Sequence, residues 1–281
     1  TLHDIIYMES SYYKILTGSA TAYQKFGNVY RKLIVPRVVK KSDKIITVSH
    51  FEKNRIAEFF EIEEDNRLEA VYNGVSTHFK PISDEAELKR VKEKYHLPDN
   101  FFFFLGNTDP KKNTKGVLKA FSDFLKQTKS DYKLVMLDYD MNELKKLLDE
   151  IGDKQLMNQI VLTGYVVNTD LPAIYSLSTI FLYPSLRESF GIPMLEAMAC
   201  GVPVITSNTS SMPEVSGDAA HIVNPYNPEE ITEGIIKILS EKEYSENLCK
   251  KGIERSKLFS WKNMAEQILV LYNEIKMKHH D

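Results

Sequence analysis

The stretch from Ile180 to Thr206, IFLYPSLRESFGIPMLEAMACGVPVIT, constrains the fold more than any other part of the sequence. It opens with a short, β-rich apolar run, Ile180 to Tyr183, which a proline ends. Pro193 suits the first turn of a helix, where a missing N–H costs nothing. Gly201 stands where a glycine commonly follows a helix, and Val202 to Thr206 is a second buried-looking run. The stretch therefore predicts a strand, a loop, a helix and a second strand.

Two carboxylates mark this unit: Glu188 in the loop and Glu196 about one turn into the helix. The free N–H groups of a helix N-terminus attract anions, and a carboxylate can accept two hydrogen bonds from a vicinal diol. The chain has 39 acidic residues, so the spacing alone indicates a solvated surface. The loop favours a ligand, because Gly191 lets the backbone approach one closely. We expect a ligand with hydroxyls at both ends and negative charge between them, such as a nucleotide sugar.

Residues 184–205, PSLRESFGIPMLEAMACGVPVI, resemble the donor-site motif of retaining GT-B glycosyltransferases of family 4. That motif is a glutamate, seven residues and a second glutamate; Ser189 replaces its usual first glycine. The resemblance implies that Glu196 holds the ribose, while Glu188 and the amides of Phe190 and Gly191 hold the sugar. The donor-binding residues that it implies in this segment are Glu188, Ser189, Phe190, Gly191, Ile192, Leu195 and Glu196.

A second segment, FFFFLGNTDPKKN at 101–113, predicts a strand, a glycine loop and the start of a helix, the arrangement with which α/β sheets bind phosphate. Lys112 can place a cation against a diphosphate, although a lysine pair alone indicates a solvated surface. The loop resembles the family's G-x-x-x-P-R-K-N/G segment, which implies donor contacts from Gly106, Lys111 and Lys112. Asn107 stands where many members carry an arginine, so that one charge is missing or supplied elsewhere.

Two further segments gain a role only from the resemblance. His3 alone would be a polar residue at the end of a strand, but the family has a histidine near the donor sugar at this point. The catalytic residues implied are therefore His3, Glu188 and Lys112. The segment Gly164, Tyr165 and Val166 would border the nucleobase pocket, mostly through its backbone.

The order of the elements predicts an α/β fold. Strands and helices alternate across 101–206, which argues for a doubly wound parallel sheet. SDKIITVSHFEKNRI at 42–56 and VYNGVSTHFKP at 71–81 resemble the late N-terminal domain and the linker of the family. We expect a GT-B fold of two Rossmann-like domains, the N-terminal one incomplete. Residues 1–78 would belong to the acceptor-side domain, 79–258 to the nucleotide-sugar domain, and 259–281 to a helix that packs back on the first. We expect the protein to begin upstream of Thr1.

The local patterns also predict the other elements. Ser49 and Glu52 form a capping box at the start of a helix, and Pro36 indicates a break or kink in the preceding one. The predicted strands are 44–48, 68–72, 100–106, 132–138 and 160–163. The predicted helices are 29–41, 50–60, 85–95, 114–126, 141–151, 170–176, 228–240, 243–256 and a last one from about 261 to 277.

Composition excludes several classes of function. The formal net charge is −3 and there is no basic arm, so we expect no nucleic-acid partner. Two cysteines do not make a disulfide framework, and Cys200 has the context of a buried apolar residue in a reducing compartment. No run of 18 apolar residues and no signal peptide are present. No His/Cys cluster has metal-ligand spacing, and the resemblance implies no metal and no cofactor.

The sequence thus predicts a retaining, metal-independent hexosyltransferase, most similar to bacterial mannosyltransferases. It would move mannose or a similar hexose from a GDP- or UDP-sugar to a glycan or lipid-linked acceptor in polysaccharide or lipopolysaccharide synthesis. A cytoplasmic location is expected, and the basic helix at 29–41 is either a solvated face or a peripheral contact with the inner face of the membrane. One alternative is a nucleotide-sugar-binding module without transfer activity. An epimerase is disfavoured, because epimerases lack the E-x-F-G-x-P-x-L-E pattern.

Overall fold

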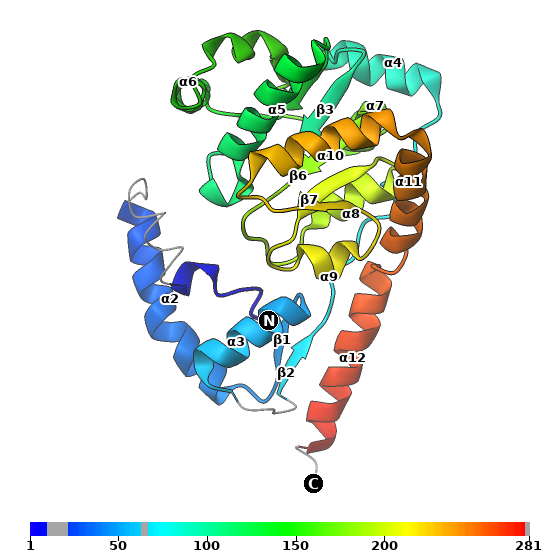
Figure 1. Ribbon diagram of the computed structural model, residues 1–281. Helices are drawn as coiled ribbons and strands as arrows, with labels where there is room; N and C mark the ends of the chain where they lie inside the picture. Colours follow the sequence, from blue (N-terminus) through cyan, green and yellow to red (C-terminus); the bar gives the residue numbers. More distant parts are fainter. Residues whose placement is uncertain (10–21, 63–66, 279–281) are drawn as a thin grey trace. The chain divides into compact units, whose positions relative to one another are not determined.

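The computed structural model describes residues 1–9, 22–62 and 67–278, and the chain folds into two compact units (Figure 1). The first unit combines Thr1–Gly74 with Trp261–Asp281, and the second is Val75–Ser260. Residues 75–260 are described without a gap. The two ends of the second unit are bonded to each other, since the Val75 N–H donates to the Phe259 carbonyl at 3.0 Å.

The first unit contains a βαβ arrangement. Strands β1 (Ile45–Thr47) and β2 (Leu68–Ala70) pair in parallel, and α3 (His50–Phe60) connects them through the segment 61–67. The Ser49 hydroxyl accepts from the Glu52 N–H at 3.1 Å, which confirms the predicted cap. The other described helices of this unit are η1 (Ile6–Met8), α2 (Ala22–Lys41) and α12 (Trp261–Lys278). The core joins side chains from η1, α2, α3 and both strands.

Helix α2 runs through Pro36 to Lys41, so the proline does not break the helix, and the kink expected as the alternative stays a prediction. A proline inside a helix removes one hydrogen bond and crowds one carbonyl. The turns on either side are complete, and α2 continues across the proline to its basic C-terminal turn at Lys40 and Lys41.

The second unit is built on a sheet in which every described pair of neighbouring strands is parallel. Its order is β5-β4-β3-β6-β7-β8. From β3 the chain winds outward through β4 to β5, then returns to the other side of β3 and winds outward from β6 to β8. This is the doubly wound Rossmann order, whose ligand crevice lies where the winding reverses. That point is between β3 and β6. The strands are β3 (Phe101–Phe104), β4 (Lys133–Met136), β5 (Ile160–Leu162), β6 (Ile180–Tyr183), β7 (Val204–Ser207) and β8 (His221–Val223).

Helices cover both faces of this sheet, because successive side chains of a strand point to opposite faces. Phe102 packs edge-on against Phe121 and Phe124 of α5, with ring centroids 5.9 and 5.3 Å apart. Phe103 packs against Tyr175 of α7 on the other face, at 5.2 Å. The four phenylalanines of β3 are all buried and therefore form core on both sides of the sheet. The helices and 3₁₀ turns of this unit are α4 (Glu85–Lys94), η2 (Pro110–Lys112), α5 (Thr114–Thr128), α6 (Met141–Glu150), η3 (Lys154–Gln159), η4 (Asn168–Asp170), α7 (Leu171–Leu177), α8 (Ile192–Ala199), α9 (Met212–Ser216), α10 (Pro228–Ser240) and α11 (Lys242–Ser256).

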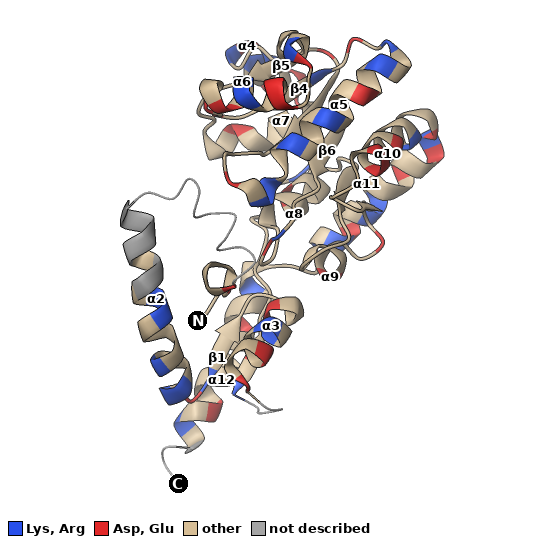
Figure 2. Ribbon diagram, turned by 60° about the vertical axis from the view of Figure 1, so that its left-hand side comes forward, with Lys and Arg blue, Asp and Glu red and all other residues tan. Residues whose placement is uncertain are grey.

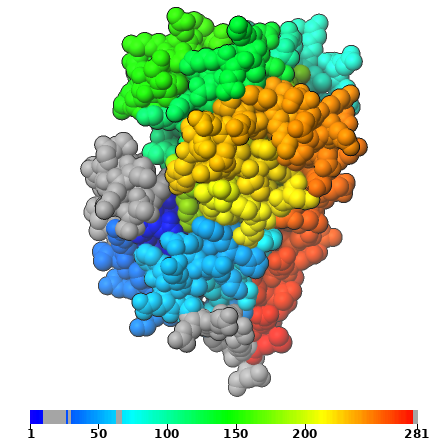
Figure 3. All heavy atoms as spheres, viewed as in Figure 1, coloured from blue at the N-terminus to red at the C-terminus, as the bar shows by residue number. Residues whose placement is uncertain are grey.

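The outer surfaces of these helices are charged and mixed in sign. Helices α5 and α10 lie against each other over one face of the sheet, and Figure 3 shows the green and orange atoms of these regions adjoining. Both basic and acidic side chains occur along α4 and α6 (Figure 2). Such surfaces are those of ordinary solvated helices. The chemistry of this unit therefore has to be sought at the ends of the strands.

Candidate active site

Two loops meet at the carboxyl ends of β3 and β6, where the winding of the sheet reverses. Residues 105–113 follow β3, and residues 184–191 follow β6. The Leu186 N–H donates to the Lys111 carbonyl at 2.7 Å, so the two loops are joined through their backbones. Because the strands are adjacent and parallel, their loops emerge at the same edge of the sheet. The tertiary fold thus brings together the two segments that the sequence singled out independently.

Lys112 and Glu188 form an ion pair across these loops. The Lys112 ammonium donates to Glu188 Oε1 at 2.6 Å, and their side chains are only 15% and 10% exposed. The same ammonium donates to the Tyr183 hydroxyl at 3.1 Å. A pair removed from water to this degree interacts more strongly than a surface pair, and each partner would be costly to leave alone. The geometry therefore places one mobile cation and one carboxylate at the mouth of the crevice.

The backbone around Glu188 is fixed by the loop that follows β7. The Glu188 N–H donates to the Ser210 hydroxyl at 3.1 Å, and its carbonyl accepts from the Ser211 hydroxyl at 3.0 Å. Ser210 itself has a left-handed backbone, with φ of 53°. Three hydrogen-bonded loops, after β3, β6 and β7, thus hold the position of the carboxylate.

Asn113, the residue after Lys112, braces a further loop. Its side-chain amide donates to the carbonyl of Pro184 at 3.1 Å and to that of Pro225, in the loop after β8, at 2.7 Å. Its backbone is left-handed, with φ of 59°, a conformation that asparagine tolerates better than most residues. The end of the Lys112 loop is therefore fixed against the carboxyl ends of two further strands, β6 and β8.

Gly191 forms the corner between the Glu188 loop and α8. Its φ of 94° lies in the left-handed region, and a Cβ there would stand 2.5 Å from Met212 Cε. A glycine is therefore required both by the backbone and by the space available. The preceding Phe190 is buried, with its ring edge-on to Phe259 at 5.7 Å. These contacts fix the first turn of α8, which begins at Ile192.

Glu196 lies one turn into α8 and has a different environment from Glu188. It is half-buried, and its Oε2 accepts from the Tyr175 hydroxyl at 3.1 Å. Burial raises the pKa of Glu196 to about 7, against the opposing effect of that hydrogen bond. Among the residues that the structure describes, no lysine or arginine forms an ion pair with it. One carboxylate of the motif is thus paired with a cation, while the other can exchange its proton near neutral pH.

The structure places the remaining predicted residues as follows. Gly106 is buried, and a Cβ there would collide with the Phe104 ring. Asn107 is exposed, and its side-chain oxygen accepts from the Asp109 N–H at 2.9 Å, which shapes the loop. Lys111 lies 3.9 Å from the Asp109 carboxylate. Leu195 is fully buried on α8, so its side chain belongs to the core.

Two predicted segments lie apart from these loops in the chain. Gly164 to Val166 follow β5, and the Tyr165 side chain is 81% exposed. His3 belongs to the first unit, where it is exposed and its carbonyl accepts from the Thr47 hydroxyl at 3.1 Å. Thr47 ends β1, so His3 lies near the carboxyl end of that strand. Its role near a donor sugar stays a prediction.

Sequence reasoning missed the residues that support the site. Tyr175 and Tyr183 are the two buried tyrosines whose hydroxyls reach Glu196 and Lys112. Asn113 and Ser210 hold the loops. The tyrosines occur within apolar runs, where an aromatic residue indicates core. Only the asparagine carried a signal, since it follows the predicted phosphate-binding lysine.

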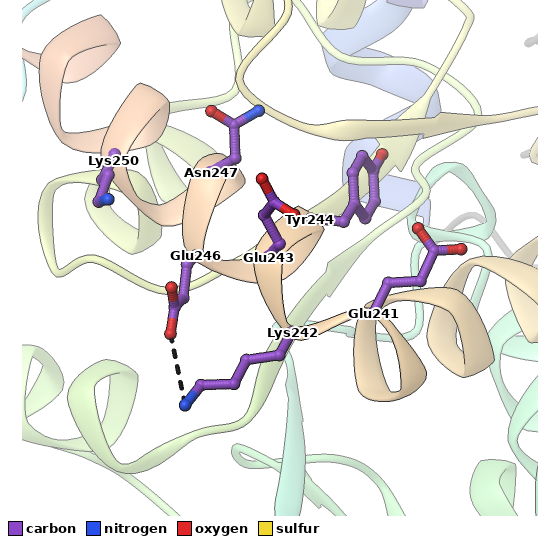
Figure 4. Close-up of a pocket in the computed structure, with 7 residues that line it drawn as sticks. All are labelled: Glu241, Lys242, Glu243, Tyr244, Glu246, Asn247 and Lys250. Carbon is purple, nitrogen blue, oxygen red and sulfur yellow. Dashed lines mark ion pairs between the residues drawn. The ribbon is translucent and has the colours of Figure 1, made fainter.

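A hollow of about 750 Å³ in the second unit lies elsewhere. It is found where α10 ends and α11 begins (Figure 4). Because α10 runs back from the carboxyl end of β8, this hollow is at the amino-end edge of the sheet, away from the two loops. Lys242 and Glu246 pair across it at 3.7 Å, as the dashed line in Figure 4 shows. It is lined by Glu241, Lys242, Glu243, Tyr244, Glu246, Asn247 and Lys250, none of which belongs to the candidate site.

The part of the chain that the structure describes holds neither a candidate metal cluster nor a membrane-spanning helix. Over 1–9, 22–62 and 67–278, no group of three or more His, Cys, Asp and Glu side chains is arranged to hold a metal ion. Over the same part of the chain, no helix combines the length and the apolar character needed to cross a membrane.

Comparison with known families assigns both units. The family described as "Glycosyl transferases group 1" matches residues 85–255, and the one described as "Glycosyltransferase Family 4" matches residues 1–79. The chain is 34% identical over 229 residues to the O-antigen chain mannosyltransferase B of Escherichia coli. The match covers 81% of this chain and 60% of that protein. The chain thus spans less than two thirds of the length of this curated relative.

Solved structures show the same fold. A glycosyltransferase from Rickettsia africae superposes with a TM-score of 0.73 at 23% identity, over 88% of this chain and 66% of that one. Anabaena Alr3699/HepE, solved in complex with UDP and glucose, gives 0.76 at 16% identity, over 97% and 70%. The expected GT-B architecture and the resemblance to bacterial mannosyltransferases are confirmed. With its family match spanning the whole sheet and both loops of the crevice, the chain belongs to the group 1 glycosyltransferases.

Proposed function

We propose that the protein is a retaining, metal-independent hexosyltransferase of polysaccharide or lipopolysaccharide synthesis. It would transfer mannose or a similar hexose from a GDP- or UDP-sugar to a glycan or lipid-linked acceptor. The observation that carries this proposal is the Lys112–Glu188 pair at the carboxyl ends of β3 and β6, with Glu196 one turn into α8. One cation and two carboxylates match a ligand with a negative centre and polyhydroxylated ends.

Each group has a distinct role in this proposal. Lys112 leaves Glu188 and binds the diphosphate, as a mobile ammonium can. Glu188 then accepts hydrogen bonds from the hydroxyls of the donor sugar. Glu196, in its ionised form, accepts both hydroxyls of the ribose. Two similar proteins support the substrate class: one is a mannosyltransferase, and one was solved with UDP and glucose.

The transfer itself follows from where charge develops. The bond between the sugar's anomeric carbon and the diphosphate oxygen breaks, and a bond to the acceptor oxygen forms on the same face. A departing phosphate oxygen takes the acceptor's proton, so that no protein base is needed. Lys112 stabilises the negative charge that grows on the diphosphate, which is electrostatic stabilisation of the transition state. His3 stays a candidate for the sugar side of the reaction.

Nucleotide binding gives the first test. The purified chain is heated with GDP, UDP, ADP and their common sugar conjugates, and the shift in unfolding temperature is recorded. Ligand at 100 times its Kd stabilises the folded state by about 2.7 kcal/mol. Selective stabilisation by one nucleotide would support the donor site and identify the base. Absence of a shift with every one of these ligands would contradict the proposal.

A second candidate function is a nucleotide-sugar-binding module without transfer activity. The observation that favours it is that this chain spans only 60% of its mannosyltransferase relative. The nucleotide that binds is offered as its sugar conjugate, and release of free nucleotide is followed by chromatography. Binding without release, with or without a glycan acceptor, would favour the module. Release that depends on the acceptor would favour the transferase.

A further inference from the structure

Tyr175 of α7 is fixed more firmly than any side chain that the sequence assigned to the site. It is fully buried, and three aromatic rings meet its ring edge-on. The centroids of Phe103, Phe181 and Phe79 lie 5.2, 5.2 and 6.0 Å away. Edge-to-face contacts of this kind favour one orientation of a ring. The phenol oxygen therefore has one position relative to the sheet.

That oxygen is directed at the first turns of α8. It lies 3.1 Å from Glu196 Oε2 and 3.3 Å from the Pro193 carbonyl, so a single proton serves two acceptors. The other carboxylate oxygen, Glu196 Oε1, makes no hydrogen bond within the described residues. The arrangement holds one oxygen of the carboxylate against the protein and leaves the second for a ligand.

We propose that Tyr175 is a positioning residue of the donor site, whose hydroxyl holds one oxygen of the Glu196 carboxylate so that the other can accept hydrogen bonds from the ribose. This inference rests on the proposed function and adds to it a residue outside the glutamate motif. Tyr175 does not touch the donor; it acts through Glu196. Its ring is part of the core, whereas its hydroxyl serves the site.

Among the groups around Glu196, the Tyr175 hydroxyl is the one that favours the charged form of the Glu196 carboxylate. The titratable groups that act on it are Tyr175 of α7, Tyr183 of β6 and Cys200 on α8 itself. Burial raises the pKa of both tyrosines well above its usual value and that of Cys200 to about 12, so all three are neutral at pH 7. Helix α11 packs on α8 with Gly252 against Met198, and β7 contributes a buried strand. No cation of the described α11 or β7 pairs with Glu196.

The test is Tyr175→Phe, which keeps the ring and removes only the hydroxyl. Nucleotide Kd is measured by calorimetry between pH 5.5 and 8.5. At pH 7 we expect roughly tenfold weaker binding, the value of one hydrogen bond to a charged group. We also expect the rise of affinity with pH to move to higher pH. An effect on folding alone would weaken binding equally at every pH.

Two variants control this measurement. Tyr244→Phe also removes a tyrosine hydroxyl, one that lies 2.9 Å from His221 Nδ1 at the other end of the sheet, and should leave the pH profile unchanged. In a Glu196→Gln background, Tyr175→Phe should cause no further change in the pH profile, because no carboxylate is left whose charged form the hydroxyl could stabilise.

A measurement without ligand separates the two proposals. The titration of the Glu196 carboxyl carbon is followed by NMR in the wild-type chain and in Tyr175→Phe. A higher pKa in the variant supports the role of Tyr175 even where no nucleotide binds, and in that case the donor-site proposal alone fails. An unchanged Glu196 pKa, or an unchanged nucleotide Kd and pH profile where the wild type binds, would overturn the inference.

Discussion

The Lys112 ammonium and Glu188 Oε1 lie 2.6 Å apart, although 76 positions of the chain separate the two residues. Each stands in a loop at the carboxyl end of a strand, and the two strands are neighbours at the switch point of the sheet. The pair satisfies both charges when no ligand is present. A diphosphate that takes Lys112 must therefore replace Glu188, and the sugar that it carries must satisfy the carboxylate.

This exchange predicts opposite effects for two variants. Lys112→Ala should weaken the binding of the nucleoside diphosphate by about tenfold or more, since a hydrogen bond to a charged group is lost. Glu188→Gln should tighten the same ligand, because the competitor for Lys112 is gone, yet weaken its sugar conjugate. Calorimetry with both ligands measures the two effects. Lys115→Ala is the control, since Lys115 pairs with Glu150 at 2.8 Å on the exposed side of α5 and takes no part in the site. Equal changes for both ligands in Glu188→Gln would contradict the exchange.

The raised pKa of Glu196 predicts how stability depends on pH. Its pKa is about 7 in the folded chain and 4.5 as an unperturbed group, so the folded state holds a proton that the unfolded state has lost between these values. Stability therefore falls as pH rises from about 4.5 to 7, by up to about 3 kcal/mol from this group. Urea unfolding at pH 5 and 8, without nucleotide, measures the difference. In Glu196→Gln, the free energy of unfolding should depend less on pH and should be higher than that of the wild type at pH 8. The same dependence on pH in both proteins would contradict the raised pKa of Glu196.

Gly191→Ala should destabilise the second unit by about 2 to 4 kcal/mol, because strain of the left-handed backbone adds to overpacking against Met212. Gly152→Ala is a matched control. Gly152 also has a positive φ, of 73°, but a Cβ there meets nothing within 4 Å. Chemical denaturation of both variants separates the two costs. If the two substitutions cost the same, the contact with Met212 contributes nothing and the corner of α8 is less tightly packed than the structure indicates.

Asp170 predicts a second stability effect, in the acid range. Its burial would raise its pKa, but hydrogen bonds from Arg90, Lys94 and Tyr95 outweigh that effect and hold the pKa at about 2. The folded state thus favours the charged form, and stability is lost as pH falls from about 4 toward 2. Its contribution at neutral pH is about 2 kcal/mol.

Asp170→Asn should therefore lower the free energy of unfolding at pH 7 by about 2 kcal/mol or more. The difference from the wild type should shrink at pH 2.5, where the carboxylate is partly protonated. Urea denaturation at the two pH values measures both quantities. Lys89→Ala is the control, because Lys89 pairs with Glu93 on the exposed side of α4 and should show neither effect. A constant difference between wild type and variant at both pH values would contradict the role of the charge.

Local patterns were sufficient to predict most elements of the second unit. The apolar runs at 101–104 and 180–183 became β3 and β6, and the helix with Pro193 in its first turn became α8. Strands β5 and β8 are only three residues long, and the pattern did not predict β8, because so short a run carries little periodicity. In the first unit the local rule failed at Pro36, where α2 continues.

The composition of the site could be predicted only in part. Glu188 and Lys112 stand in loops beside a glycine and a helix start, and Glu196 lies one turn into such a helix, where charged residues indicate a ligand. Tyr175 and Tyr183 could not be found in this way, because in the sequence each is one more aromatic residue among apolar neighbours. Their hydroxyls gain a function from the residues that they face across the fold.

By itself, the sequence determined which segments are strands, which are helices and which loops carry charge, because periodicity, prolines and glycines act over a few residues. The tertiary structure decided which loops meet. Parallel strands β3 and β6 became neighbours through the winding of the sheet, and this brought Lys112 onto Glu188 and Tyr175 onto Glu196. Burial then gave the two carboxylates different environments, since Glu188 gained a cation as its partner and Glu196 only a hydroxyl. Those differences depend on long-range packing, which no local pattern contains.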